Sequence, residues 1–310
     1  MSISDEILSL KEKNDVVILS HNYQLPEVQD ISDFVGDSLG LSRKASTDEE
    51  SIILVCGVYF MAETASIINP SKTVLIPDTG AGCSLVDSSP SIDWVEKWKR
   101  THPGGIVVSY VNTSAAIKAA SDYCCTSSNA VKIVESIPSE KEILFLPDMF
   151  LGAYVQEKTG RSIDIWPGEC HVHAGIRPAD LESSLAQHSG SEFLIHPECS
   201  CGSNLLYSSH KEDISHTKFF STEGMVDHVK NSPNDKFIIA TETGILHRLK
   251  KEAPDKTCLP VNDDAVCKYM KMIDLEKVRF SLLNKVHEVK VDKNTASKSR
   301  SAIQKMLDIS

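Results

Sequence analysis

One ordered set of landmarks occurs three times along this 310-residue chain. Each set begins with a polar signature directly after a short apolar run: SHNYQ contains His21, SYVNT contains Tyr110 and IHPEC contains His196. A hydroxyl residue near the start of a helical pattern follows, and a cysteine closes the set. Segments of this length are too long for solenoid repeats. The pattern therefore predicts three homologous small domains.

The later landmarks keep nearly constant spacing. The hydroxyl residues are Ser38, Ser127 and Thr222, and the cysteines that follow them by 45, 43 and 45 positions are Cys83, Cys170 and Cys267. The third copy is longer before its hydroxyl residue, and we interpret the polar run CSCGSNLLYSSHKED as an inserted loop. The alternative is that three α/β segments merely look alike, but ordinary βα repetition does not place one cysteine per segment at matching positions.

The hydrophobic pattern indicates the fold class. Short β-branched runs such as VVILS, GIVVSY, EILFLPD and KFIIATE alternate with helical stretches, which is typical of parallel sheets in α/β proteins. We expect three homologous parallel-sheet α/β domains around a pseudo-threefold axis, with the active site at the centre. The predicted domains are residues 1–88, 89–176 and 177–272. Residues 273–310 should form two helices that pack on the first domain.

Charge and hydropathy exclude several classes of partner. The net charge of −11 argues against nucleic acid and anionic membranes. No apolar run approaches the ~20 residues that span a bilayer. The start of the chain, MSISDEILSLKEKN, is acidic and has a helical pattern, so it does not resemble a secretory signal. We therefore expect a cytoplasmic protein.

The three matched cysteines predict a metal site. Ligands of open α/β sheets bind beyond the carboxyl ends of the strands, and equivalent ends of three related domains would meet at the axis. Zinc would usually require a fourth protein ligand or histidine, whereas iron–sulfur clusters prefer thiolates. A cubane cluster held by only three cysteines leaves one iron without a protein ligand, which can act on a substrate as a Lewis acid.

The chain has nine cysteines, and some alternatives stay open. Cys170 and His173 have the Cys-x-x-His spacing of a zinc site, although the other two copies lack a matching histidine. Cys199 and Cys201 form a C-x-C for which zinc binding or redox chemistry is an alternative. The remaining cysteines are interpreted as packing residues or left without a role: Cys56 in a strand, Cys124 and Cys125 at a helix start, and Cys258, which has no counterpart.

Nine motifs together resemble the quinolinate synthase family: HNYQLPEVQDISDFVGDSLGLS, DTGAGCSL, YVNTSAAIKAASDYCCTSSNAV, LPDMFLG, WPGECHVH, HPEC, STEGM, IATETGILHRLKKEAPDK and CKYMK. The resemblance implies three α/β domains around a [4Fe-4S] cluster held by Cys83, Cys170 and Cys267. It also implies condensation of iminoaspartate with dihydroxyacetone phosphate to quinolinate, with release of phosphate and water, in de novo NAD synthesis. The enzyme that makes iminoaspartate would be a functional partner.

The same resemblance implies the substrate-binding residues: His21, Ser38, Tyr110, Val111, Asn112, Ser127, His196, Pro197, Glu198 and Thr222. We expect Glu198 to be the general base, with a pKa raised by neutral surroundings. Tyr23 and Tyr110 would donate or relay protons, and His196 would bind carboxylates or transfer protons. An iron or oxygen sensor and a zinc hydrolase are the competing classes, but a sensor has little use for matched serines, histidines and tyrosines.

Overall fold

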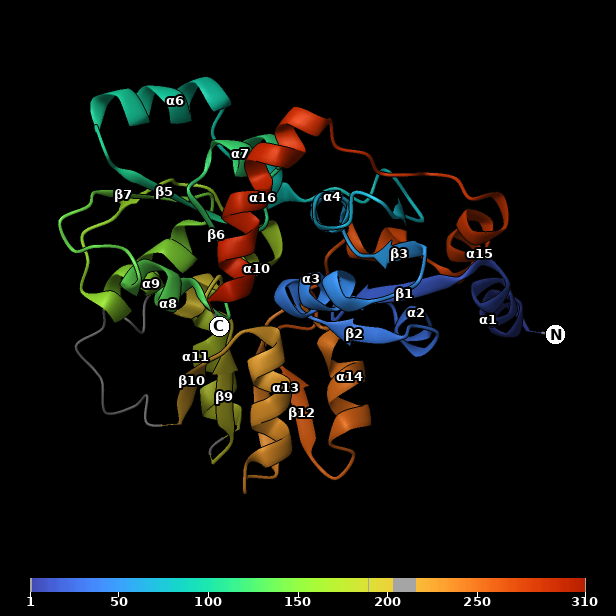
Figure 1. Ribbon diagram of the computed structural model, residues 1–310. Helices are drawn as coiled ribbons and strands as arrows, with labels where there is room; N and C mark the ends of the chain where they lie inside the picture. Colours follow the sequence, from blue (N-terminus) through green and yellow to red (C-terminus); the bar gives the residue numbers. More distant parts are fainter. Residues whose placement is uncertain (1, 189, 203–215, 310) are drawn as a thin grey trace.

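The computed structural model describes residues 2–188, 190–202 and 216–309, and in them the strands form three four-stranded, all-parallel sheets (Figure 1). The first sheet contains β1 (Val16–His21), β2 (Phe34–Gly36), β3 (Ile52–Cys56) and β4 (Thr73–Leu75). The second contains β5 (Ile106–Tyr110), β6 (Tyr123–Cys125), β7 (Ile143–Leu146) and β8 (Asp164–Ile165). The third contains β9 (Glu192–Ile195), β10 (Thr217–Phe219), β11 (Lys236–Ala240) and β12 (Thr257–Pro260).

The strand order is the same in each sheet: β2-β1-β3-β4, β6-β5-β7-β8 and β10-β9-β11-β12. This order confirms the predicted α/β fold in three similar units. We call β1–β4, β5–β8 and β9–β12, each with its helices and the loop after its last strand, the first, second and third units. The domain bounds 1–88, 89–176 and 177–272 stay a prediction.

Helices follow most strands. The first unit has α1 (Ile3–Asn14), α2 (Pro26–Asp30), α3 (Ser38–Thr47), α4 (Tyr59–Ile68) and α5 (Ser84–Asp87). The second has α6 (Ile92–Thr101), α7 (Ala115–Ala120), α8 (Ala130–Glu135), α9 (Met149–Thr159) and α10 (His171–Gly175). The third has α11 (Pro178–Gln187), α13 (Thr222–Asn231), α14 (Ile245–Glu252) and a 3₁₀ turn (Met270–Met272), and α15 (Leu275–Asn284) and α16 (Lys293–Asp308) close the chain.

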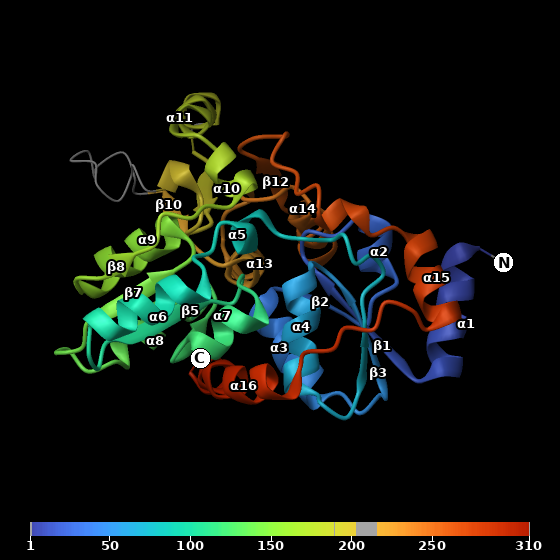
Figure 2. The same ribbon diagram turned by 90° about the horizontal axis from the view of Figure 1, so that it is seen from above.

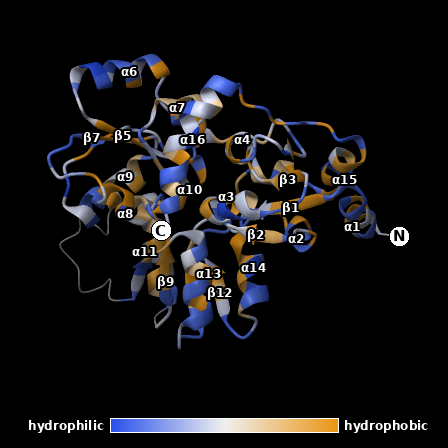
Figure 3. Cartoon of the chain, viewed as in Figure 1, coloured by the Kyte–Doolittle hydropathy of each residue, from blue (hydrophilic) through white to orange (hydrophobic). Residues whose placement is uncertain are grey.

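Local sequence explains where the strands end and the helices begin. The side chains of Asp37, Ser114, Asp148 and Ser221 accept hydrogen bonds from backbone N–H groups of the first turns of α3, α7, α9 and α13. These residue types are the preferred N-caps of helices. Figure 3 shows hydrophobic residues along strands such as β1, β3 and β9, with hydrophilic residues on the outer sides of helices such as α6 and α14. The core therefore lies between the sheets and their helices.

The shared strand order also determines where each unit can bind a ligand. Because the second strand lies on one side of the first and the third strand lies on the other, each sheet has a topological switch point between its first and third strands. Ligands bind at such points, beyond the carboxyl ends of the strands. Figure 2 shows the short helices α5 and α10 near the middle of the molecule, between the sheets.

The C-terminal helices differ in what they cover. Helix α15 packs on α1 of the first unit, whereas α16 packs mainly on α7 and β6 of the second unit and also touches α4 and α3. Asn129 donates to the carbonyl oxygens of Met306 and Ile309, at 2.9 and 2.7 Å. The C-terminal stretch thus packs on the first unit through α15, whereas α16 lies between the second unit and the first.

Cys124 and Cys125 lie in strand β6 and are fully buried, so they are not at a helix start as predicted. Most of the predicted inserted loop, from residue 203 onward, lies outside the described residues. In the part of the chain that the structure describes, no helix is long and apolar enough to cross a membrane.

Candidate active site

One cavity lies where the three units meet, with about 660 Å³ of empty space that is partly open to solvent. It is lined by residues of every unit: His21, Tyr23, Ser38 and Cys83 from the first, Tyr110, Asn112, Ser127, Cys170 and His173 from the second, and His196, Glu198, Thr222, Glu242 and Cys267 from the third. The cavity thus brings together most of the side chains that the sequence singled out. Two do not line it: Val111 faces a neighbouring pocket beside α3 and α4, and Pro197 faces a groove beside α3, α8 and α13.

The three predicted metal ligands occupy equivalent places in the fold. Cys83, Cys170 and Cys267 each follow the last strand of their sheet, and a short helix or turn begins directly after or soon after each. Burial raises the pKa of the Cys83 thiol to about 12, while hydrogen bonds from the backbone N–H groups of Val86 and Leu85 act in the opposite direction. These donors therefore favour the thiolate form.

The other two thiols have comparable surroundings. Burial raises the pKa of Cys267, and the N–H groups of Met270 and Tyr269 oppose that shift. Burial likewise raises the pKa of Cys170, and the charge of His173 opposes that shift. Three thiols on one cavity, each beside a group that favours the thiolate form, fit a metal group that is bound by thiolates.

A second possible donor set overlaps this one. One ligand atom each from Cys170, His173 and Glu198 lies within 4.8 Å of the others. This set corresponds to the Cys-x-x-His alternative, with Glu198 as a third member that the sequence did not indicate. It shares Cys170 with the three-cysteine set, so the two modes of metal binding exclude each other.

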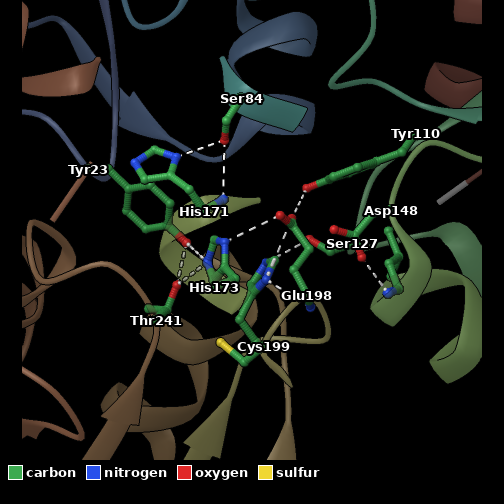
Figure 4. Close-up of polar contacts among 12 residues, drawn as sticks. Tyr23, Ser84, Tyr110, Ser127, Asp148, His171, His173, Glu198, Cys199 and Thr241 are labelled. Carbon is green, nitrogen blue, oxygen red and sulfur yellow. Dashed lines mark hydrogen bonds and ion pairs between the residues drawn. The ribbon is translucent and has the colours of Figure 1, made fainter. Parts of the chain in front are cut away.

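Glu198 is the centre of a buried polar network (Figure 4). The hydroxyl of Tyr110 donates to its Oε1. Nδ1 of His173 lies 3.3 Å from Oε2, and Nδ1 of His196 lies 3.6 Å from Oε1. His196 extends the network to Ser127, because its Nε2 lies 3.1 Å from Oγ of Ser127. The network therefore joins side chains of the second and third units.

The electrostatics of Glu198 contradict one expectation. Burial alone would raise the pKa of Glu198, but the charges of His173 and His196 and the hydrogen bond from Tyr110 together lower it to about 2. Its surroundings are therefore not neutral as predicted, and the carboxylate stays ionised near neutral pH. The pKa of His173 shows the matching effect: burial lowers it, but Glu198 and Cys170 outweigh burial and raise it to about 10.

Two histidines and two tyrosines of the cavity are neutral. Burial lowers the pKa of His21 to about 3, with a further contribution from His196. Burial also lowers the pKa of His196 to about 3, although Glu198 acts in the opposite direction. The pKa values of Tyr23 and Tyr110 are raised well above the ordinary value, first by burial. Both tyrosines therefore keep their protons.

Tyr23 is fixed by His173 and by Thr241, of which the sequence did not indicate Thr241. Its hydroxyl makes a hydrogen bond with Thr241 and lies 3.3 Å from Nε2 of His173 (Figure 4). Thr241 and Glu242 directly follow β11, in the ATETG stretch, and both are buried. Asp148 directly follows the short loop after β7 and is also buried. Asp148, Thr241 and Glu242 all follow the third strand of their unit, so the end of that strand is the signal that could have found them.

The three hydroxyl landmarks lie close to helix N-termini. Ser38 and Thr222 are the first residues of α3 and α13, and Ser127 lies in the turn before α8. Asn22 donates to Oγ1 of Thr222 at 2.9 Å, which links the first signature to the third unit. Backbone N–H groups at such N-termini attract anions. The cavity can therefore receive carboxylate or phosphate groups near these residues.

The fold and the cavity define a three-unit α/β protein with a central, cysteine-bearing site of the kind that enzymes use. The family model described as Quinolinate synthetase A protein matches residues 5–308. The chain is 55% identical to a quinolinate synthase of Thermus thermophilus, over 99% of this chain and 97% of that protein. It is 53% identical to the quinolinate synthase of Pyrobaculum aerophilum, over 99% of both chains.

A more distant relative agrees with these two. A quinolinate synthase of Mycobacterium tuberculosis is 48% identical over 98% of this chain and 88% of that protein. The chain therefore belongs to the quinolinate synthase family, which confirms the resemblance drawn from the nine motifs.

Proposed function

We propose that this chain condenses iminoaspartate with dihydroxyacetone phosphate to form quinolinate, with release of phosphate and water, for de novo NAD synthesis. The observation that carries the proposal is the central cavity, where one cysteine from each unit lies beside the buried Glu198 network. Membership of the family supports the same reaction. The enzyme that supplies iminoaspartate would be its functional partner.

The metal group that we propose is a [4Fe-4S] cluster held by Cys83, Cys170 and Cys267. When bound, a cluster with one iron free of protein ligands supplies a Lewis acid for a substrate oxygen or nitrogen. The thiols fit this role because each lies on the cavity beside a group that favours its thiolate form. The remaining steps are assigned to side chains of the cavity.

Proton transfer is assigned to the Glu198 network. Glu198 is ionised, so it accepts protons, but its pKa of about 2 makes it a weak base by itself. Tyr110 donates to Glu198 and keeps its own proton, so it can pass a proton between substrate and carboxylate. Tyr23 can likewise relay a proton between the substrate and the hydroxyl of Thr241, to which it is hydrogen-bonded. Base catalysis would therefore involve Glu198 and Tyr110 as a pair.

Substrate binding is assigned to the neutral polar groups. Oδ1 of Asn112 is buried and has no hydrogen-bond partner within the described ranges, so it can accept from a substrate hydroxyl or imine. Ser38, Ser127 and Thr222 would bind carboxylate or phosphate oxygens together with nearby N–H groups. His21 and His196 are neutral, so each can donate from one ring nitrogen without repelling a cationic partner.

Anaerobic metal analysis followed by an activity assay tests the proposal. Protein purified without oxygen should contain about four iron and about four sulfide per chain, by the composition of a cubane. It should form quinolinate from the two substrates. One zinc per chain without sulfide would instead support the set of Cys170, His173 and Glu198 and would overturn the cluster. Full iron and sulfide without quinolinate formation would overturn the reaction.

A further inference from the structure

The carboxylate of Glu242 makes contacts that the proposed reaction does not use. Glu242 is fully buried and lines the cavity beyond β11. Its Oε1 accepts from the backbone N–H of Cys267 at 3.0 Å and lies 2.9 Å from Nζ of Lys271. Its Oε2 accepts from the N–H of Gly244 at 2.6 Å. A fully buried carboxylate is costly unless it is paired and hydrogen-bonded, and here both conditions are met.

Lys271 connects this carboxylate to another unit. Its backbone N–H donates to the carbonyl oxygen of Cys267 at 3.1 Å, so both residues belong to one turn. Its Nζ also donates to the backbone carbonyl oxygen of Tyr23. One ammonium group therefore joins the turn that carries a predicted metal ligand to the signature that carries Tyr23.

Tyr23 is consequently held at two points by the third unit. Thr241 binds its hydroxyl, and Lys271 binds its carbonyl oxygen. Gly244 shows how closely these groups pack, because a Cβ there would lie 2.7 Å from Nζ of Lys271 and 2.8 Å from both Oε2 of Glu242 and the carbonyl carbon of Tyr23. The backbone of Gly244 has an ordinary φ of −59°, so close contact rather than conformation requires glycine.

We propose that Glu242 and Lys271 are positioning residues that tie the Cys267 turn to Tyr23, so that one ion pair aligns a metal ligand and a substrate-contacting tyrosine. The inference rests on the proposed function, since Cys267 acts in it as a cluster ligand. Glu242 holds the turn by the N–H of Cys267. Lys271, bound to the same carboxylate, holds Tyr23.

The two residues should have separable effects. Glu242→Gln removes the negative charge to which the N–H of Cys267 and the ammonium group of Lys271 are bound. It should therefore lower the iron content after anaerobic reconstitution and also weaken quinolinate binding. Lys271→Met leaves the hydrogen bonds of Glu242 to Cys267 and Gly244 in place, so it should keep the iron content and weaken quinolinate binding by about tenfold, the value of one hydrogen bond to a charged group. Lys271→Arg should restore most of the affinity.

A double-mutant cycle tests whether Lys271 acts through Tyr23. The dissociation constant of quinolinate is measured by anaerobic calorimetry for the wild type, Lys271→Met, Tyr23→Phe and the double variant. If Lys271 places Tyr23, its substitution should change the affinity much less in the Tyr23→Phe background than in the wild type. Equal effects in the two backgrounds would overturn the proposal, as would unchanged iron content in Glu242→Gln.

A matched pair of glycine substitutions tests the packing. Gly244→Ala inserts a methyl group between Glu242, Lys271 and Tyr23 and should weaken quinolinate binding, whereas Gly175→Ala has no atom within 4 Å of the new Cβ and should behave as the wild type. Equal affinities for both variants would count against the link. The reconstituted wild type separates this test from the proposed function: if it lacks iron and sulfide, the proposed function itself fails.

Discussion

Replacing Tyr110 by phenylalanine removes one oxygen atom, the one that donates to the carboxylate of Glu198. Both side chains are buried, with exposed fractions of 5% and 2%. Hydrogen bonds to charged groups contribute about 1.5–3 kcal/mol. The free energy of unfolding at pH 7 should therefore fall by that amount. Turnover should fall as well, because the proposed proton path passes through this hydroxyl.

The pH dependence of the stability loss makes the test specific. The pKa of Glu198 is about 2, lowered from 4.5, so its stabilising contribution is fully present above pH 4.5 and is lost as the pH falls through about 2. Without Tyr110 as donor, the pKa of Glu198 should move upward. The stability difference between the wild type and Tyr110→Phe should thus be constant above pH 4.5 and shrink below it. Urea unfolding followed by circular dichroism at several pH values measures this difference.

Tyr59→Phe is the matched control. The same atom is removed, but the hydroxyl of Tyr59 makes no hydrogen bond within the residues that the structure covers, so the change should stay within ~0.5 kcal/mol. Equal stability of Tyr110→Phe and the wild type would refute the buried hydrogen bond. A difference that grows on acidification would refute the ionised state of Glu198.

Three further predictions concern the metal site and the base. Cys83→Ser should lose bound iron and sulfide, whereas Cys199→Ser should keep both. The reason is that the Cys199 thiol donates to the carbonyl oxygen of Ala240 and does not line the cavity. Loss of iron in Cys199→Ser would mean that the wrong thiols were chosen. Gly168 lies two residues before Cys170, and a Cβ there would lie 2.5 Å from the backbone oxygen of Pro147. Gly168→Ala should therefore lower the iron content, and a normal iron content would contradict this reasoning. Glu198→Gln should keep the iron and lower kcat by ~10²-fold or more, and a near-normal rate would reject its role in proton transfer.

The repeated landmarks allowed most of the fold to be predicted from the sequence. Each landmark follows a strand or begins a helix, and parallel strands place such positions at one edge of a sheet. The spacing of Cys83, Cys170 and Cys267 therefore indicated that they occupy equivalent positions in the three units. The structure places all three on one cavity. Their role as cluster ligands stays a prediction.

The properties that arise between units could not be predicted. The pKa of Glu198 depends on His173 and Tyr110, which lie in another unit, and no local pattern around HPEC indicates their approach. Lys271 and Tyr23 are likewise distant in sequence but joined by a hydrogen bond. Helix α16 lacks any mark that would assign it to the second unit, since its amphipathic face fits either surface.

The repeated strand order has a consequence for how such a site could arise. Each unit supplies one thiol, one polar strand end and one helix start, and none supplies a cavity by itself. A single unit of this kind would have to associate as a ring of three copies to place three thiols around one centre. In one continuous chain the three units need not be identical, and the equivalent strand ends of β1 and β5 hold different side chains, His21 and Tyr110.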